Sequence, residues 1–404
     1  MSAELVAIGD EVLGGYTVDT NSAWMARQLA RIGVQVVRHT VVGDDMDRLL
    51  EVFEAACSRA DVVVACGGLG PTPDDMTRFA VSRFVDRPLV EQPEAVEHMK
   101  VIFRQFNRAM APTNLRQARF PEGARLLENP LGTAMGFAVE TRGTRMYFVP
   151  GIPDELMGMA PQILDDIAEH LPGVQKLHEL SFRTVGIGES DLAQALEGLL
   201  ERGGDPMVGT YVTSGIITVR LFGTDAEATE RLCEQMVDRL RENVYTRDER
   251  TLEEVLVGTL SDRGQTLALA ESCTGGLVSK EITDVSGSSA VLLEGAVVYS
   301  NDAKVRRCGV PPEMLQQHGA VSEPVARQLA EGIRKAAGAT WGIGITGIAG
   351  PTGGTDEKPV GLVYIALSGP TGTVVEKNTF RGPRFRVRRR TATRALDMLR
   401  RAMG

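Results

Sequence analysis

The sequence predicts an α/β protein of three parts: a parallel-sheet domain, a small α+β domain and a second α/β domain. At 404 residues the chain is longer than one hydrophobic core usually serves, which indicates two or three domains. Short apolar runs alternate with segments whose apolar residues recur every three to four positions, as strands and helices do in parallel α/β domains. This alternation changes character near residue 171 and restarts near residue 249. We therefore expect domains at residues 1–170, 171–248 and 249–404.

The first domain is predicted from strands that alternate with helices. Residues 4–8, 34–42 and 61–66 are apolar runs typical of strands, and apolar residues at helical spacing fall between them. Parallel sheets of this kind bind ligands beyond the carboxyl ends of their strands. The loops that follow these three strands are therefore the expected ligand sites.

The middle part is expected to be a small α+β domain. Strands are predicted at residues 181–185 and 216–222, and helices at residues 191–200 and 226–243. The segment GIGES, residues 186–190, is predicted to be a tight turn that leads into a capped helix.

The last domain begins with a helix-start signal. Thr251 and Glu254 form a T-x-x-E capping box ahead of apolar residues at helical spacing. Further helices are predicted from Ser322 to Lys335 and from near Pro383 to the end of the chain. The predicted strands cover residues 266–270, 291–300, 341–346, 360–367 and 373–380.

The composition favours a soluble cytoplasmic protein. No apolar run approaches the roughly 20 residues of a membrane span, and the N-terminus lacks the basic start and apolar core of a signal peptide. The five cysteines show no CxxC spacing, so we expect reduced thiols rather than a disulfide framework or a zinc site. The net charge of −9 argues against non-specific or stable binding of nucleic acid, which needs a positive surface.

The string GGLGPTPDD, residues 67–75, directly follows a predicted strand. Its glycines let the backbone approach a ligand and aim N–H groups at phosphate. The adjacent carboxylates of Asp74 and Asp75 suit a hard divalent cation, which would screen the charge of the phosphates. The alternative is a tight turn in which Asp74 caps the following helix. The string alone does not separate these interpretations.

Three further loops of the first domain carry polar residues beyond predicted strands. They are GDE at residues 9–11, NPLGT at residues 129–133 and PGIP at residues 150–153. Each loop alone is weak evidence of a ligand site, because glycine and proline commonly mark turns.

Together these strings resemble the N-terminal domain of the CinA family of competence/damage-inducible proteins, itself similar to molybdopterin-binding domains. The segments GDEVLGGYTVDTNS, GGLGPTPDD, NPLGTAMG and PGIPDEL carry the resemblance, which covers about residues 1–170. It implies hydrolysis of ADP-ribose to AMP and ribose 5-phosphate with Mg²⁺, Mn²⁺ or Co²⁺. The implied metal ligands are Asp74, Asp75, Asp10 and Glu11. The implied substrate contacts are Gly67, Gly68, Gly70, Thr72, Asn21, Thr133 and Gly151.

The string AESCTGG, residues 270–276, lies between a predicted strand and a helix. Ser272 and Cys273 are both candidate nucleophiles there, and backbone N–H groups at the helix start can stabilise an oxyanion. The alternative is a serine helix cap beside a small buried cysteine. His318 is the only histidine of this domain, so Lys304, at the end of YSNDAK, is the better candidate base. A solvated surface lysine is the alternative for Lys304.

Two further segments of the last domain suit a nucleotide. The loop TGIAGPTGG, residues 346–354, can wrap a ribose or phosphate through its backbone N–H groups. Seven arginines lie between Arg381 and Arg394, and on a helix Arg384 and Arg388 share one face. Such a face either clamps a phosphate or is simply solvated. Arg386, Arg390 and Arg394 share another face.

The strings AESCTGG, GAVVYSNDAK, HGAVSEP, GIAGPTGG and FRGPRFRVRRR resemble the C-terminal CinA domain, the nicotinamide-nucleotide amidohydrolase family, over about residues 251–403. The resemblance implies that Ser272 is the nucleophile and Lys304 the base in hydrolysis of nicotinamide mononucleotide without a cofactor, in a homodimer. One departure is Pro383, where an acidic residue often stands. The implied substrate contacts are Tyr299, Thr274, Gly275, Gly276, Gly347, Gly350, Arg384 and Arg388.

Two other functions are compatible with parts of the sequence. A catalytically silent scaffold that acts in DNA uptake or recombination would keep the fold, but its site residues would be free to change. The sequence argues against this function because it retains the site residues Ser272, Lys304, Asp74 and Asp75. A molybdopterin-handling protein would explain GGLGPTPDD but not the last domain.

Overall fold

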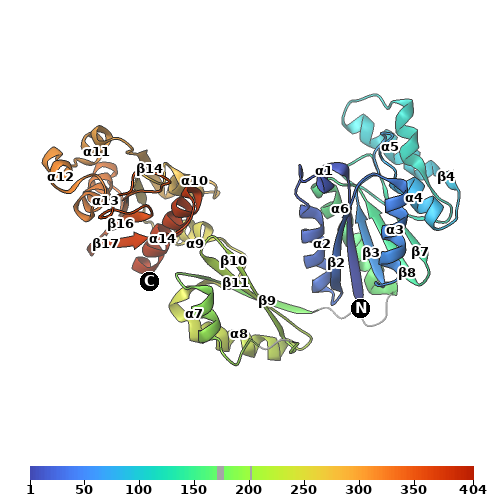
Figure 1. Cartoon of the computed structure of the whole chain (residues 1–404), viewed down its shortest axis with the longest axis horizontal. Helices are drawn as coiled ribbons and strands as arrows, with labels where there is room; N and C mark the ends of the chain where they lie inside the picture. The colour runs from blue at the N-terminus through green and yellow to red at the C-terminus, as the bar shows by residue number, and fades with distance from the viewer. Residues whose placement is uncertain (171–176, 201–202) are drawn as a thin grey trace. The chain divides into compact units, whose positions relative to one another are not determined.

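The chain folds as two compact units in a computed structural model that describes residues 1–170, 177–200 and 203–404. The first unit is Met1–His178 and the second is Glu179–Gly404 (Figure 1). Among the described residues, no helix is both long and apolar enough to cross a bilayer.

A six-stranded sheet in the order β2-β1-β3-β8-β7-β6 forms the centre of the first unit. The strands β2, β1, β3 and β8 are parallel, which confirms the predicted parallel arrangement, and β7 and β6 add an antiparallel edge. The strand bounds are β1 (Ser2–Ile8), β2 (Gln35–Val42), β3 (Val62–Cys66), β6 (Arg125–Leu127), β7 (Gly136–Thr141) and β8 (Thr144–Val149).

Helices cover both faces of this sheet. Figure 1 shows α2 (Thr20–Arg31) and α6 (Pro153–His170) on one face and α3 (Met46–Cys57) with α4 (Thr77–Phe84) on the other. Successive residues of β3 therefore enter different cores: Val62 packs with the first pair of helices and Val63 with the second. The remaining elements are α1 (Asp10–Leu13), α5 (Pro93–Gln105), the 3₁₀ helix η1 (Pro112–Ala118) and the two-stranded sheet of β4 (Leu89–Glu91) and β5 (Arg119–Pro121).

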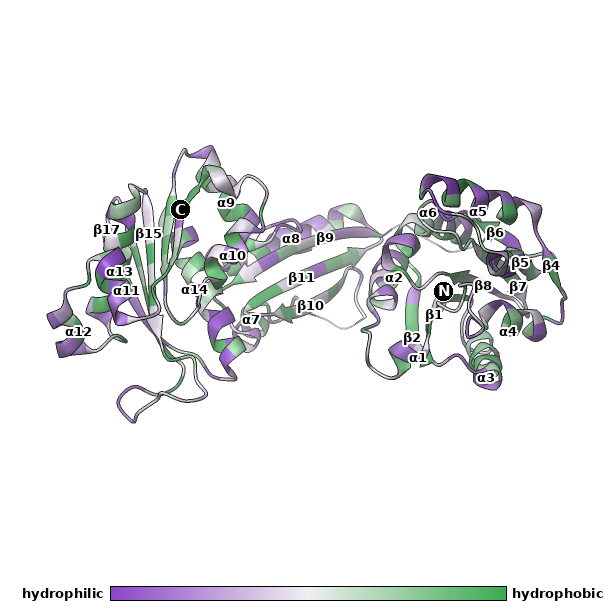
Figure 2. Ribbon diagram, turned by 90° about the horizontal axis from the view of Figure 1, so that it is seen from above, coloured by the Kyte–Doolittle hydropathy of each residue, from purple (hydrophilic) through white to green (hydrophobic). Residues whose placement is uncertain are grey.

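The second unit begins with a four-stranded sheet in the order β10-β11-β9-β12. Its elements are β9 (His178–Val185), α7 (Glu189–Ala195), β10 (Met207–Thr213), β11 (Ile216–Gly223), α8 (Ala226–Leu240), η2 (Arg241–Asn243) and β12 (Val244–Thr246). Hydrophobic and hydrophilic residues stand side by side along these strands (Figure 2).

The predicted elements of this middle part are confirmed except at their edges. Helix α7 is shorter than predicted. The predicted cap is wrong, because the N-cap residue is Gly188, which has no side chain to accept a hydrogen bond. Residues 201–202, near the predicted end of that helix, lie outside the described residues. The strands β10 and β12 were not predicted, because β10 is mostly exposed and β12 has three residues, so neither shows periodic burial.

The rest of the second unit is a five-stranded sheet in the order β14-β13-β15-β16-β17. The first three strands are parallel and the last two antiparallel. The strands are β13 (Leu267–Glu271), β14 (Leu292–Val297), β15 (Trp341–Gly347), β16 (Leu362–Gly369) and β17 (Gly372–Thr379). The helices are α9 (Leu252–Asp262), α10 (Leu277–Thr283), η3 (Ser288–Ala290), α11 (Asn301–Cys308), α12 (Pro312–His318), α13 (Glu323–Ala337) and α14 (Arg384–Met403). The predicted capping box at Thr251 is present in full.

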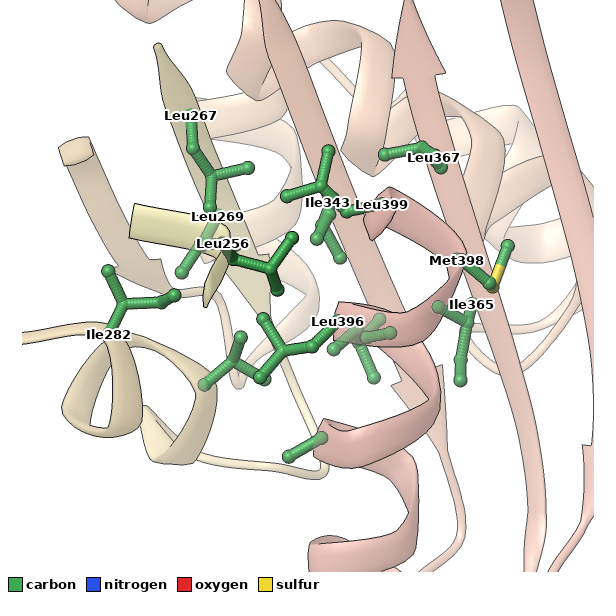
Figure 3. Close-up of a cluster of buried hydrophobic side chains, with 14 of the residues drawn as sticks. Leu256, Leu267, Leu269, Ile282, Ile343, Ile365, Leu367, Leu396, Met398 and Leu399 are labelled. Carbon is green, nitrogen blue, oxygen red and sulfur yellow. The ribbon is translucent and has the colours of Figure 1, made fainter. Parts of the chain in front are cut away.

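Alternate residues of β13 enter different cores. Leu267 and Leu269 pack against α9, α10 and α14, as Figure 3 shows, whereas Ala268 and Ala270 face the side of α13. Val185 of β9 belongs to the first of these cores, so the middle sheet and the five-stranded sheet share a core. The parallel strands β13 and β15 end at the same edge of the sheet, which brings the loops after them together.

Candidate functional site

Ser272 and Lys304 meet at the carboxyl end of β13. Ser272 follows the last residue of that strand, and its N–H donates to the carbonyl of Ile345 on β15 (3.1 Å). Lys304 lies on α11, whose start is capped by the Ser300 hydroxyl, which accepts from the N–H of Ala303 (3.1 Å). The Lys304 Nζ is 3.3 Å from the Ser272 Oγ. The two predicted catalytic residues are therefore within hydrogen-bond distance.

Lys304 is buried without a carboxylate partner. Its side chain is 2% exposed, which rules out the alternative of a solvated surface lysine. Its Nζ donates to the carbonyls of Val298 (2.8 Å) and Tyr299 (3.1 Å), and no ion pair to it occurs among the described residues. Burial lowers the pKa of Lys304. A neutral amine has two N–H bonds for the two carbonyls and one lone pair, which leaves the lone pair to accept the Ser272 proton.

Cys273 is the weaker candidate nucleophile. Its side chain is 5% exposed, and this burial raises the pKa of the thiol to about 12. The negative charge of Glu271 also raises the pKa. The thiolate is the reactive form of cysteine, so this thiol is inert near neutral pH. Ser272 does not cap α10, whose N-cap position is Gly276.

Glu271 organises the turn that carries Ser272, and sequence reasoning missed it. Its fully buried carboxylate accepts hydrogen bonds from the N–H groups of Gly276 (3.0 Å), Val278 (3.1 Å) and Ser279 (2.8 Å), and from the Ser279 hydroxyl (2.7 Å). It thereby holds the start of α10 against the end of β13. The signal was present in the sequence, because an acidic residue ends the otherwise apolar run LALAE.

Helix α14 contacts this turn at Thr274. Gly275 (φ 59°) and Gly276 (φ 89°) adopt left-handed backbone conformations that favour glycine. The carbonyl of buried Thr274 accepts from the Arg388 Nε (3.1 Å), and the Thr274 Oγ1 has no hydrogen-bond partner among the described residues. Arg388 thus fixes the turn beside the nucleophile.

Arg384 joins the glycine loop to the segment before α11. Its guanidinium donates to the carbonyl of Gly350 (2.9 Å) and to the Tyr299 hydroxyl (3.2 Å). Tyr299 is 60% exposed, so its ring is accessible at this edge. Gly347 has a packing role, since a Cβ there would lie 2.7 Å from the carbonyl of Leu362 on β16. The predicted residues of the last domain thus lie around one edge of the sheet.

In the first unit the glycines of the GGLG loop allow close approach of the backbone. A Cβ at Gly67 (φ 119°) would lie 2.0 Å from the carbonyl of Ile8, and one at Gly68 (φ 66°) would lie 2.2 Å from the Thr77 Oγ1. The Thr77 hydroxyl donates to the Gly67 carbonyl (2.9 Å). The loop therefore sits directly over the ends of β1 and β3.

Asp75 is engaged inside the same loop. Its carboxylate accepts from the N–H groups of Gly70 (2.7 Å) and Thr72 (2.8 Å) and from the Thr72 hydroxyl. Both carboxylate oxygens thus accept hydrogen bonds from the loop, and Asp75 holds the loop in shape. Asp74 does not cap α4, whose N-cap position is Met76 without a side-chain hydrogen bond. The capping alternative for Asp74 is therefore wrong.

Arg78 lies beneath the loop, and sequence reasoning missed it. Its side chain is 1% exposed and donates to the carbonyls of Leu69 (2.6 Å) and Gly70 (2.8 Å), while its Nε has no hydrogen-bond partner among the described residues. Burial lowers the pKa of Arg78 to about 10, which leaves it charged near neutral pH, and Asp75 favours that charge. A buried cation thus supports a loop that was predicted to hold phosphate.

Asp10 is joined by a second carboxylate that sequence reasoning missed, Asp44. The Asp10 N–H donates to the Asp44 carboxylate (3.1 Å), and the Asp44 N–H donates to the Asp10 carboxylate (3.2 Å). Burial raises the pKa of Asp44, and the charges of Asp10, Glu11 and Asp74 raise it further. Within residues 1–170, 177–200 and 203–404, no group of three or more Asp, Glu, His or Cys side chains is already gathered as a metal site.

The other predicted contacts of the first unit lie on neighbouring loops. The Asn21 amide donates to the carbonyl of Gly151 (2.7 Å), which ties the loop after β8 to the start of α2. The Thr133 hydroxyl donates weakly to the Gln117 side chain (3.4 Å). Asn21 and Gly151 are thus in direct contact, whereas Thr133 contacts Gln117.

Comparison with family models covers most of the chain. Residues 4–170 match a "Probable molybdopterin binding domain", residues 180–247 a "Damage-inducible protein CinA KH domain" and residues 249–403 a "CinA C-terminal domain".

Full-length relatives agree with these matches. The chain is 42% identical over 413 residues to a "CinA-like protein" of Anaeromyxobacter sp. (strain K), and the match covers all of both chains. The chain belongs to the CinA family. It is also 40% identical to a "CinA-like protein" of Kosmotoga olearia, covering 100% of this chain and 99% of that relative. Among solved CinA-family structures, a competence/damage inducible protein from Agrobacterium tumefaciens is 40% identical over 38% of this chain and 93% of its own, with a TM-score of 0.37.

Proposed function

We propose that the last domain hydrolyses the carboxamide of nicotinamide mononucleotide to nicotinate mononucleotide and ammonia. The observation that carries the proposal is the 3.3 Å contact between the Ser272 hydroxyl and a buried lysine amine that no carboxylate of the described residues neutralises. This is the arrangement that a serine nucleophile and a lysine base require. An intact pair of this kind also argues against a catalytically silent scaffold.

In the first half-reaction the Ser272 Oγ forms a bond to the carboxamide carbon and its proton passes to the Lys304 Nζ. Lys304 then gives this proton to the departing nitrogen, so that the C–N bond breaks and ammonia leaves. The N–H groups at residues 273–274 are candidates to stabilise the oxyanion, since they lie in the turn beside the nucleophile. The product of this step is an ester of Ser272.

In the second half-reaction water attacks the ester. Lys304 accepts a proton from the water and returns a proton to the Ser272 oxygen, which releases the carboxylate product. Two steps of moderate difficulty thereby replace one difficult amide hydrolysis. Arg384, beside Gly350 and Tyr299, would hold the remote phosphate, and this positioning should make free nicotinamide a poor substrate.

Substitution of the pair tests this proposal. We expect Ser272→Ala and Lys304→Ala each to lower ammonia release from nicotinamide mononucleotide by about a thousandfold or more. The double variant should be little worse, because the two groups act as one unit. Cys273→Ala is the matched control and should retain most activity. Normal turnover by Ser272→Ala would disprove the assignment.

We also propose that the first domain hydrolyses ADP-ribose to AMP and ribose 5-phosphate with a divalent cation. The GGLG loop above buried Arg78 supports phosphate binding. The raised pKa of Asp44 among Asp10 and Asp74 supports a cation, which would relieve their repulsion. Asp10, Glu11, Asp44 and Asp74 would hold it, and Asp75 would keep the loop in shape. A bound divalent cation supplies charge neutralisation for the diphosphate.

Chelation and substitution test the second proposal. EDTA should abolish cleavage of ADP-ribose and spare ammonia release by the last domain. Asp44→Asn should raise the concentration of Mg²⁺ needed for half-maximal cleavage by about tenfold. Asp47→Asn, at a carboxylate that is 85% exposed on α3, is the matched control. Cleavage at an unchanged Mg²⁺ requirement in Asp44→Asn would remove this carboxylate from the ligand set.

A further inference from the structure

A cavity of about 440 Å³ lies within the second unit, where the middle sheet meets helix α14. The turn GIGES borders it on one side and α14 on the other. Its size is that of sites for small organic ligands. Neither proposed reaction uses any residue of this cavity.

The GIGES turn packs directly against α14. Gly186 has a φ of 77°, and a Cβ there would lie 2.9 Å from the Asp397 Oδ2 and 3.0 Å from the Arg401 Nη2. Asp397 is fully buried and forms ion pairs with Arg394 (2.7 Å), Arg400 (2.7 Å) and Arg401 (2.9 Å). The buried carboxylate of Asp397 in the cavity lining is thus paired with three arginines.

The walls of the cavity are mainly apolar. Val185 and Ile217 are buried side chains of β9 and β11, and Val212 of β10 is 51% exposed at the rim. Phe380, which follows β17, adds an aromatic ring. Such walls suit a flat apolar body, which aromatic and branched side chains contact over a large area.

One cation of the cavity remains free to bind a ligand. Arg394 is committed to Glu376 and Asp397, whereas Arg390 has no ion pair among the described residues and donates only a long hydrogen bond to the carbonyl of Arg381 (3.4 Å). A guanidinium of this kind matches a phosphate or carboxylate in two parallel hydrogen bonds. Arg390 therefore provides the recognition group.

The charge balance of the cavity argues against a polyanionic ligand. Glu189 and Asp397 line the cavity together with Arg390 and Arg394, so its formal charges sum to zero. A polyanion such as nucleic acid needs a positive surface, which this cavity does not present. A single phosphate or carboxylate on an apolar body fits both the walls and the one unpaired cation.

We propose that this cavity binds a small organic anion of mononucleotide size, with its phosphate or carboxylate on Arg390 and its flat body against Phe380 and Val212. The proposal is independent of both proposed activities, because it concerns residues that neither reaction uses. It assigns a function to the GIGES turn and to Arg390 of α14.

Photolabelling of the full chain tests the site with 8-azidoadenosine 5′-monophosphate as the probe. We expect covalent label, mapped by mass spectrometry, on residues 185–189 or 212–217. Val212→Trp, which fills the rim, and Arg390→Gln, which removes the cation, should each lower the label on these segments by about tenfold. The matched controls are Val374→Trp, at a 62% exposed position of β17, and Arg389→Gln, and neither should change it.

Each result of this experiment is decisive. Label confined to other segments at millimolar probe, or label on these segments that neither Val212→Trp nor Arg390→Gln lowers, would overturn the site. Equal labelling by uncharged 8-azidoadenosine would overturn the assignment of an anion to Arg390. Both variants should keep the circular dichroism spectrum and the urea unfolding midpoint of the unaltered chain, which shows that they fold.

Discussion

The protonation state of Lys304 decides whether it can act as a base. Lysine in water is charged near neutral pH, and a charged amine cannot accept the Ser272 proton. Burial without a carboxylate partner favours the neutral amine and lowers the pKa of Lys304. The absence of an acidic neighbour among the described residues is thus as important for the proposed chemistry as the distance to the serine.

The lowered pKa of Lys304 predicts the pH dependence of the amidase. The neutral amine is the active form, so kcat/KM for nicotinamide mononucleotide should rise with pH through the lowered pKa. It should level off below the value of 10.5 that is ordinary for lysine. Lys304→Arg should be inactive across the same range, because guanidinium does not release its proton there. A profile of kcat/KM from pH 5 to pH 10 measures this, and a flat profile would contradict it.

Helix α10 carries a half-buried carboxylate whose position is unfavourable for its charge. Glu281 has an Oε2 without a hydrogen-bond partner among the described residues, and burial raises its pKa to about 7. The carboxylate of Glu253 on α9 raises the pKa further, and Arg389 opposes the shift. The contact between α9 and α10 is therefore less stable when Glu281 is charged.

The raised pKa of Glu281 predicts how Glu281→Gln changes the free energy of unfolding. The folded pKa is raised above the unfolded one, so the stabilising contribution is present at low pH and is lost as pH rises from about 4.5 to about 7. Glu281→Gln should therefore raise the free energy of unfolding by on the order of 1 kcal/mol at pH 8, after allowance for partial solvent screening. Urea unfolding of both chains at pH 5 and pH 8 measures the change. An equal effect at the two pH values would contradict the titration of Glu281.

At the scale of the whole molecule, the last domain shares its core with the middle sheet. Val185 of β9 and Tyr245 of β12 belong to the same buried cluster as Leu256 and Leu396. Arg400 on α14 also donates to the carbonyl of Glu242 (2.7 Å). Removal of the middle sheet would expose part of this core.

The shared core predicts how two fragments compare. A fragment of residues 249–404 should fold and release ammonia from nicotinamide mononucleotide, since it retains the capping box, the five-stranded sheet and the catalytic pair. Its free energy of unfolding should be lower than that of a fragment of residues 179–404 by about 2 kcal/mol, because the apolar surface that Val185 and Tyr245 cover would be exposed. Circular dichroism in urea and an ammonia assay measure both. An insoluble or inactive shorter fragment would show that the last domain depends on the middle sheet.

The sequence by itself determined the order of the elements and the location of the chemically special loops. Strand and helix periodicity, the Thr251 capping box and the glycine-rich strings depend on residues a few positions apart, and local conformational preferences decide them. The exposed strand β10 was missed for the same reason, because its sequence carries no periodic burial.

Only the tertiary structure decided what the individual polar groups do. Lys304 approaches a serine 32 residues away, Arg388 fixes a carbonyl 114 residues away, and Asp44 meets Asp10 across 34 residues. The pKa of a group and the availability of its hydrogen bonds follow from which segments surround it and exclude water. Asp75 illustrates this, since its place in GGLGPTPDD is compatible with a metal ligand, and only the folded loop shows both of its oxygens bonded to Gly70 and Thr72.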